Sequence, residues 1–164
     1  MKITVLCAGK LKEKYWTGAA AEYIKRLSRY GSVNIEEVPD EAAPESASAA
    51  QRVQILEREG ERFLRVIRRY NQAAHCRVIA LAIDGKTYDS AGFSRHLDEL
   101  RVSGTSHIVF VIGGSLGLAA SVLKEADEKI SFSAMTFPHQ LMRIILLEQI
   151  YRAERISRGE PYDK

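Results

Sequence analysis

The sequence predicts an α/β fold with a mainly parallel sheet covered by helices, and three observations lead to this prediction. Strand-like segments alternate with segments of helical periodicity along the chain. The segments 77–83 and 107–112 are almost wholly apolar, as strands buried on both faces are. No linker, repeat or low-complexity tract interrupts the alternation, so residues 1–164 are expected to form a single domain.

The expected elements follow in order along the chain. Strands are expected at residues 2–8, 32–38, 77–83, 107–112 and 129–135. Helices are expected at residues 13–30, 49–70, 90–101, 118–126 and 138–157. Ser90 is the expected N-cap of the third helix, and Pro138 is expected in the first turn of the last one. These patterns alone predict a plain doubly wound sheet.

Length and composition exclude several classes of protein. A chain of 164 residues, 46% of them hydrophobic, buries a core without needing a disulfide or a metal ion. No apolar run approaches the roughly 18 residues of a membrane span, and the N-terminus lacks a secretory signal core, so a cytoplasmic protein is expected. Cys7 and Cys76 lack CxxC spacing, which favours reduced core thiols over a redox pair or a metal site.

The charge distribution is more informative than the net charge of +3. Basic residues gather in segments 1–30 and 52–69, and an acidic stretch at 35–46 separates them. The basic segments fit a polyanionic partner such as nucleic acid. They fit ordinary solvated helix faces equally well.

The main candidate for a ligand site is the glycine turn Gly113-Gly114-Ser115-Leu116-Gly117. It follows an apolar strand, and ligands of open α/β sheets bind outside the carboxyl ends of the strands. The pattern is neither the GxGxxG dinucleotide fingerprint nor a P-loop. A tight connection between strand and helix explains it equally well. The glycine turn after segment 79–83 has the same two interpretations, with the plain connection favoured.

Two further segments could contribute to a site. Residues 131–139 mix small, hydroxylated and apolar side chains, and could offer backbone amides and carbonyls to a flat heterocycle. His139 lies near a helix N-terminus, where a neutral imidazole is favoured over a charged one. Arg152 follows Glu148 by four residues, so it either forms an ion pair on one helix face or contacts a phosphate or base.

The last helix, 138–157, is apolar nearly all round, which suggests burial in a subunit interface. The tail after it, 158–164, contains Gly-x-Pro-Tyr and looks more ordered than a typical chain end.

Taken together, these motifs resemble the RlmH (YbeA) family of SPOUT-class methyltransferases, which act on pseudouridine N3 of bacterial large-subunit ribosomal RNA. The resemblance covers essentially the whole chain. Its motifs are 8–12 (AGKLK), 110–114 (FVIGG), 131–139 (SFSAMTFPH), 147–153 (LEQIYRA) and Pro161-Tyr162.

The resemblance implies a SPOUT-type (alpha/beta knot) fold with a C-terminal deep trefoil knot, and a homodimer packed through the knotted region. It implies S-adenosylmethionine as methyl donor and no metal cofactor. The implied partner is ribosomal RNA within the large subunit or the assembled ribosome. The implied cofactor-binding residues are Leu81, Gly113, Phe132, Ser133, Ala134, Met135, Thr136 and Phe137. A side chain at Gly113 is expected to fill the space of the cofactor.

The implied catalytic residues are Arg152, Tyr162 and Asp163. The family tail usually has His where this chain has Asp163, and a carboxylate with an ordinary pKa near 3.9 is a weaker base than imidazole. This departure leaves an alternative, a knotted dimer that binds RNA or ribosomes without turnover.

Overall fold

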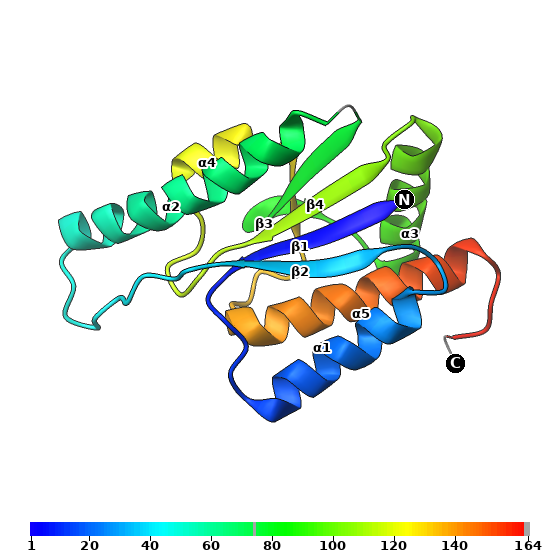
Figure 1. Cartoon of the computed structure of the whole chain (residues 1–164), viewed down its shortest axis with the longest axis horizontal. Coiled ribbons are helices and arrows are strands. Elements are labelled where there is room, and N and C mark those ends of the chain that lie inside the picture. The colour runs from blue at the N-terminus through cyan, green and yellow to red at the C-terminus, as the bar shows by residue number, and fades with distance from the viewer. Residues whose placement is uncertain (74, 163–164) are drawn as a thin grey trace.

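The computed structural model describes residues 1–73 and 75–162, and its centre is a five-stranded sheet in which every pairing is parallel. The strand order is β2-β1-β4-β3-β5 (Figure 1). The strands are β1 (Lys2–Ala8), β2 (Val33–Val38), β3 (Cys76–Thr87), β4 (His107–Ile112) and β5 (Glu128–Ser131). The helices are α1 (Lys14–Leu27), α2 (Ala49–Asn71), α3 (Ser90–Val102), α4 (Ala120–Glu125) and α5 (His139–Ser157).

Helices cover both faces of the sheet, as the sequence predicts. Side chains alternate across a strand, so Val5 and Cys7 face one layer while Leu6 and Ala8 face the other. The first layer holds α1, α3 and α5, and the second holds α2 and α4 (Figure 1). The α/β prediction is therefore confirmed. Both cysteines are free, and burial raises the pKa of the Cys7 thiol to about 12.

Strand β3 is longer than predicted, because it bends and continues through Asp84-Gly85 instead of ending there. Ile130 of β5 pairs with Leu81 before the bend and with Lys86 after it. The bend thus curls around β5, and a Cβ on Gly85 would lie 2.5 Å from the backbone of Ile130. Glycine is required for this close approach.

Several predicted boundaries are wrong, and local hydrogen bonding explains one of them. The N-cap of α3 is Asp89 and not Ser90, because the Asp89 carboxylate accepts from the N–H of Gly92 at 2.6 Å. The strand expected at 129–135 is only β5, so residues 132–138 form an irregular segment. Helices α1 and α4 are shorter than expected, and Pro138 is the N-cap residue of α5.

Helix α5 carries one buried cation, Arg143, whose side chain is fully inaccessible to solvent. Its guanidinium donates to the backbone oxygens of Ala8 and Gly9, the latter at 2.8 Å, and to the Glu37 carboxylate at 3.0 Å. These bonds satisfy a charge that would otherwise be costly to bury. They also fix the start of α5 against the carboxyl end of β1.

The two ends of α5 lie at opposite edges of the sheet. It begins beside the carboxyl ends of the strands, at the left of Figure 1, and ends at the right, beside their amino ends. There Tyr30, which precedes β2, donates to the Glu160 carboxylate at 2.6 Å. Among the described residues no helix is both long and apolar enough to cross a membrane.

Candidate active site at the carboxyl edge of the sheet

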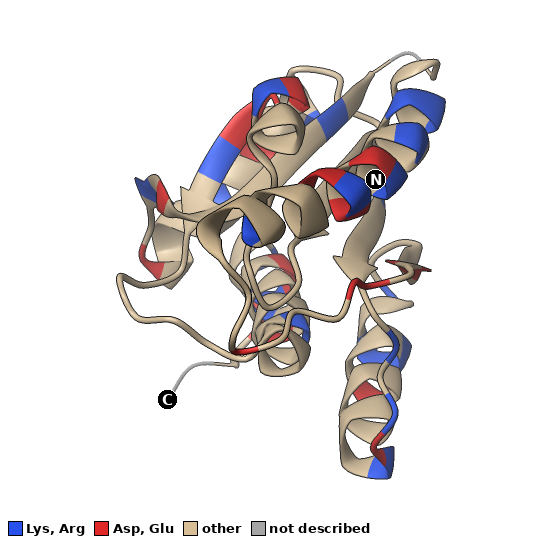
Figure 2. Cartoon of the chain, turned by 90° about the vertical axis from the view of Figure 1, so that its left-hand side faces the viewer, with Lys and Arg blue, Asp and Glu red and all other residues tan. Residues whose placement is uncertain are grey.

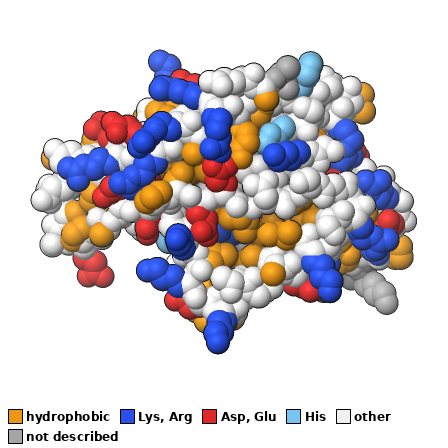
Figure 3. All heavy atoms as spheres, viewed as in Figure 1, with side chains coloured by type: hydrophobic (Ala, Val, Ile, Leu, Met, Phe, Trp, Pro, Cys, Tyr) orange, Lys and Arg blue, Asp and Glu red, His pale blue; other side chains and the backbone are white. Residues whose placement is uncertain are grey.

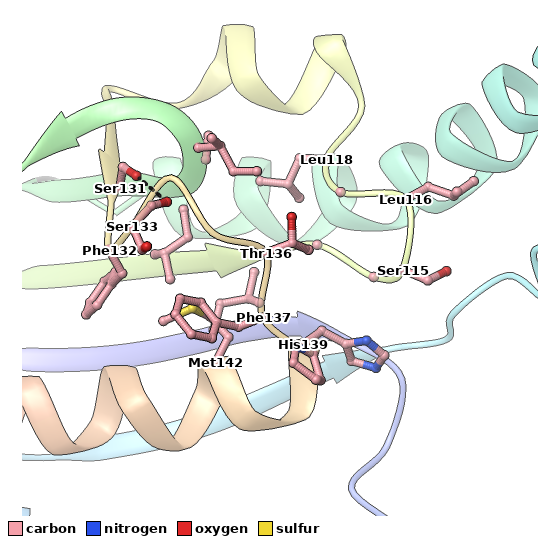
Figure 4. Close-up of a pocket in the computed structure, with 18 of the residues that line it drawn as sticks. Ser115, Leu116, Leu118, Ser131, Phe132, Ser133, Thr136, Phe137, His139 and Met142 are labelled. Atoms are coloured by element: carbon pink, nitrogen blue, oxygen red, sulfur yellow. Dashed lines mark hydrogen bonds between the residues drawn. The ribbon is translucent and has the colours of Figure 1, made fainter.

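A cavity of about 890 Å³ lies at the carboxyl edge of the sheet, between three chain segments (Figure 4). The first is the end of β3 and its bend, and the second is the glycine turn that follows β4. The third runs from β5 into the start of α5. The lining residues are Leu81–Ile83, Ile112–Leu118, Leu123, Ile130–Ser133, Met135–His139 and Met142.

The glycine turn is closed by its own backbone. The N–H of Gly117 donates to the oxygen of Gly114 at 3.1 Å. A Cβ on Gly113 would lie only 2.2 Å from the oxygen of Gly117, so no larger residue fits the turn as it stands. The expectation that such a side chain would fill ligand space is therefore corrected: it collides first with the turn itself.

A buried carboxylate supports this turn from the other side of the sheet. Glu59 of α2 is only 6% exposed. It accepts from the N–H of Gly114 at 3.2 Å and from the N–H of Glu41 at 3.3 Å. Burial raises its pKa, and the two N–H donors oppose that rise. The sequence analysis missed Glu59, since nothing in the sequence places α2 under the turn.

The irregular segment after β5 forms the opposite wall. The Ser131 hydroxyl donates to the oxygen of Ser133, whose own hydroxyl accepts from the N–H of Met135 at 3.0 Å. In Figure 4, Leu118 and Thr136 point toward one another across the cavity, while Ser115 points away. Seven of the eight predicted cofactor residues line the cavity. The eighth, Ala134, is exposed and does not.

His139 and Met142 bring the first turn of α5 to the cavity. The pKa of His139 is lowered by burial and by the positive charge of Arg143, so its ring is neutral near pH 7, as expected from the sequence. Within residues 1–73 and 75–162 no cluster of His, Cys, Asp or Glu is arranged to hold a metal ion. Apolar walls with backbone polar groups suit a flat heterocycle better than a phosphate.

The predicted catalytic residues lie elsewhere, near the end of α5. Glu148 accepts from Arg152 at 2.7 Å and from the Tyr162 hydroxyl at 3.3 Å, so the ion-pair interpretation of Arg152 is confirmed. The Arg152 guanidinium also lies 4.7 Å from the centre of the Tyr162 ring. Burial and the charge of Glu148 raise the pKa of Tyr162 to about 12. Asp163 lies outside the described residues.

This tail cluster (Glu148, Arg152 and Tyr162) is remote from the cavity of the same chain. Ten residues of α5 separate Met142 from Arg152, which corresponds to about 15 Å along the helix axis. The bond from Tyr30 to Glu160 fixes the tail at the amino edge of the sheet. The structure therefore gathers the predicted cofactor residues and separates them from the predicted catalytic ones.

The chain is similar to known proteins over its whole length. The family model described as "Predicted SPOUT methyltransferase" matches residues 1–163. A protein of Listeria welshimeri named "Ribosomal RNA large subunit methyltransferase H" is 54% identical, covering 100% of both chains. A protein of the same name from Bacillus thuringiensis is 52% identical with the same coverage.

Solved structures share the fold at low identity. A tRNA (m1G37) methyltransferase from Aquifex aeolicus has a TM-score of 0.56 at 14% identity, with 100% of this chain and 75% of that chain covered. A probable methylase family protein from Haemophilus influenzae has a TM-score of 0.57 at 13% identity, with 99% and 70% covered.

Proposed function

Because this chain belongs to the SPOUT methyltransferase family, we propose that it transfers a methyl group from S-adenosylmethionine to N3 of a pseudouridine in large-subunit ribosomal RNA. The names of relatives that are 52% to 54% identical over their full length support the RNA substrate. Residues 1–164 act as one catalytic domain. The reaction takes place where ribosomes are assembled, in the cytoplasm.

The cavity at the carboxyl edge is the proposed cofactor site, and its shape and lining fit the group. At about 890 Å³ it falls within the usual range for sites that enclose a nucleoside-sized molecule. Backbone groups of the glycine turn and of segment 131–137 bind the polar edge of the adenine, while Leu81 and Leu118 pack against its faces. The bound sulfonium supplies an electrophilic methyl group.

The curled end of β3 supports the proposal that the chain is knotted as in its family. Ile130 has strand partners on both sides of the bend, so β5 runs through a tight loop of backbone. Helix α5 then leads away from that loop. Threading of this kind is rare among folds, and here it also shapes the cavity wall.

Transfer to N3 requires that the imide proton leave and that the nucleotide be held in line with the methyl group. Arg152 offers a cation that binds the nucleotide, and Glu148 fixes the orientation of its guanidinium. The Tyr162 phenol stays protonated near neutral pH, since its pKa is about 12, so it positions the base rather than accepting the proton. Asp163 is the proposed proton acceptor on sequence grounds alone.

The distance between cavity and tail cluster carries the proposal that the enzyme is a homodimer. Apolar side chains gather between α1 and α5 on the face shown in Figure 3. Leu141 and Ile145 of α5 are only half-buried within a single chain. If two copies pack their α5 helices antiparallel across a two-fold axis, the tail of each chain approaches the cavity of the other. The active site is then assembled from both chains.

Labelled methyl transfer tests the proposal directly. The protein is incubated with methyl-tritiated S-adenosylmethionine and large ribosomal subunits or whole ribosomes that lack the modification. The expected product is 3-methylpseudouridine, identified by mass spectrometry after nuclease digestion. Cofactor binding in a calorimeter without any transfer would instead favour a non-catalytic RNA-binding dimer.

A further inference from the structure

We propose that the loop after β1 forms a docking surface for the RNA phosphate backbone beside the cavity, made by Lys10, Lys12, Lys14 and Tyr15. These four residues are called the lysine surface below. The inference rests on the proposed function, because it assigns the surface through which that reaction engages its RNA.

The charges of the lysine surface are available to a partner. All three lysines are exposed, and among the described residues no carboxylate lies within 4.0 Å of their ammonium groups. Many arginines differ in this respect, since Arg26, Arg62 and Arg101 each form an ion pair with a carboxylate. Glu13 is the one acidic residue within 10–16, so this segment keeps a positive charge. Unneutralised lysines suit phosphates, which they contact as hydrated point charges.

The location of this surface ties it to the active site. Cys7 of β1 pairs with Ile112 of β4, so the loop after β1 leaves the sheet beside the glycine turn. In Figure 4 the trace that follows β1 passes close to His139 at the cavity mouth. Figure 3 shows basic side chains projecting where this loop leads into α1. RNA held here lies next to the proposed methyl donor.

The base of the loop is held rigidly, which a docking surface needs in order to set the register of its ligand. Arg143 donates to the oxygen of Gly9 at 2.8 Å, and Glu37 accepts from the N–H of Leu11 at 3.2 Å. The same Glu37 oxygen accepts from Arg143 at 3.0 Å. The lysines therefore extend from an anchored backbone that is connected to the first turns of α5.

Tyr15 adds a contact of a different kind. Its side chain is 66% exposed, and its ring lies edge-on to Trp16 with the centroids 5.0 Å apart. An exposed ring held in place by a second ring offers a flat face on which an unpaired RNA base can stack. Figure 2 shows basic residues spread over several helices, so charge alone does not single out a surface. The combination of free lysines, an exposed aromatic ring and the adjacent cavity does.

The test removes the three charges and follows RNA binding as a function of salt. The variant is Lys10→Ala/Lys12→Ala/Lys14→Ala, and the matched control is Lys2→Ala/Lys25→Ala/Arg68→Ala, which removes three exposed charges away from the cavity mouth. Binding to large ribosomal subunits and to protein-free large-subunit RNA is measured between 50 and 300 mM KCl. The variant is expected to bind both about 100-fold more weakly at 150 mM, with a salt slope smaller by roughly 2 to 3. The control should bind like the parent.

Tyr15 is tested separately, because stacking does not depend on salt. Tyr15→Ala should weaken RNA binding at least fivefold or so at every salt concentration, while Tyr15→Phe retains the ring and binds like the parent.

Three outcomes would overturn the proposal. The lysine variant might match its control, its salt slope might equal that of the parent, or its loss might be confined to whole subunits, which would indicate a ribosomal protein as partner. Calorimetry with S-adenosylmethionine separates this proposal from the proposed function. The lysine variant should bind the cofactor normally, whereas failure of the parent to bind it would refute the proposed function instead.

Discussion

The two edges of the sheet carry different halves of one proposed active site. The carboxyl edge has a cavity walled by backbone and apolar groups, with Glu59 and Arg143 buried behind it. The amino edge has no comparable enclosure around Glu148, Arg152 and Tyr162, which form a hydrogen-bonded cluster of charged and aromatic side chains. The first arrangement suits binding of a nucleoside, and the second suits handling of a charged nucleotide. Their separation along α5 indicates that one chain is insufficient for catalysis.

The largest effect is expected at the carboxyl edge, from Gly113→Ala. The added methyl group would lie 2.2 Å from the Gly117 oxygen, so the turn must open and the cavity loses a wall. Cofactor affinity in a calorimeter should fall about 100-fold or more, a loss of the size expected when a preformed site is disrupted. Gly18→Ala is the matched control, because a Cβ there meets nothing within 4 Å. Normal binding by Gly113→Ala would mean that the cofactor site lies elsewhere.

The amino edge should respond in the opposite way. Arg152→Ala removes the proposed nucleotide contact and leaves the cavity intact, so methyl transfer should fall by roughly 100-fold while cofactor affinity stays within about twofold. Single-turnover transfer and calorimetry on the same sample measure the two quantities. Arg65→Ala, which changes an exposed arginine on α2, is the control. Equal losses of transfer and cofactor affinity would remove the functional distinction between the edges.

A smaller effect is expected from Glu59→Gln, which places an amide NH₂ against one of the two N–H groups that the carboxylate now accepts. Cofactor affinity should fall about tenfold, because one buried donor loses its acceptor. Glu57→Gln, an exposed position on the same helix, should have no effect. Parental affinity in Glu59→Gln would show that the turn holds its shape without this carboxylate.

The raised pKa of Glu59 adds a pH dependence with a defined sign. Burial raises its pKa in the folded protein above the ordinary value of 4.5, so the stabilising contribution of the protonated form is complete below 4.5 and disappears as pH rises through the folded pKa. The Tm of the parent minus that of Glu59→Gln should therefore decrease from pH 4.5 toward neutrality. A difference that increases with pH would mean that the folded pKa is lowered.

The smallest effect is expected from Tyr162→Phe. The variant keeps the ring that packs on Tyr151 at 4.9 Å and loses only the hydroxyl. Because the phenol pKa is about 12, the hydroxyl does not ionise between pH 7 and 9, and the pH profile of transfer should not change. The rate should fall by about threefold at most, since one neutral hydrogen bond is lost. A shifted profile would identify Tyr162 as a titrating group.

The sequence predicted the layers of the fold well, because periodicity reports which faces of each element are buried. It also identified the segments that line the cavity, since glycine after an apolar strand and proline before a helix mark the carboxyl edge. It missed the bend of β3 around Ile130, which depends on contact between segments about 45 residues apart. Glu59 was missed for the same reason: its partner Gly114 is 55 residues away. The separation of Arg152 from the cavity became apparent only when α5 had a direction in space.

Subunit complementation tests most directly whether the two edges act across two chains. Gly113→Ala and Arg152→Ala chains carry different affinity tags, are expressed together, and the mixed dimers are isolated by purification on both tags. Each mixed dimer has one site with an intact cavity and an intact tail, so random mixing should restore about a quarter of parental activity, and the isolated mixed dimer about half. If each site were built from a single chain, every site in the mixed dimer would carry a defect, and transfer would stay at the level of the inactive variants.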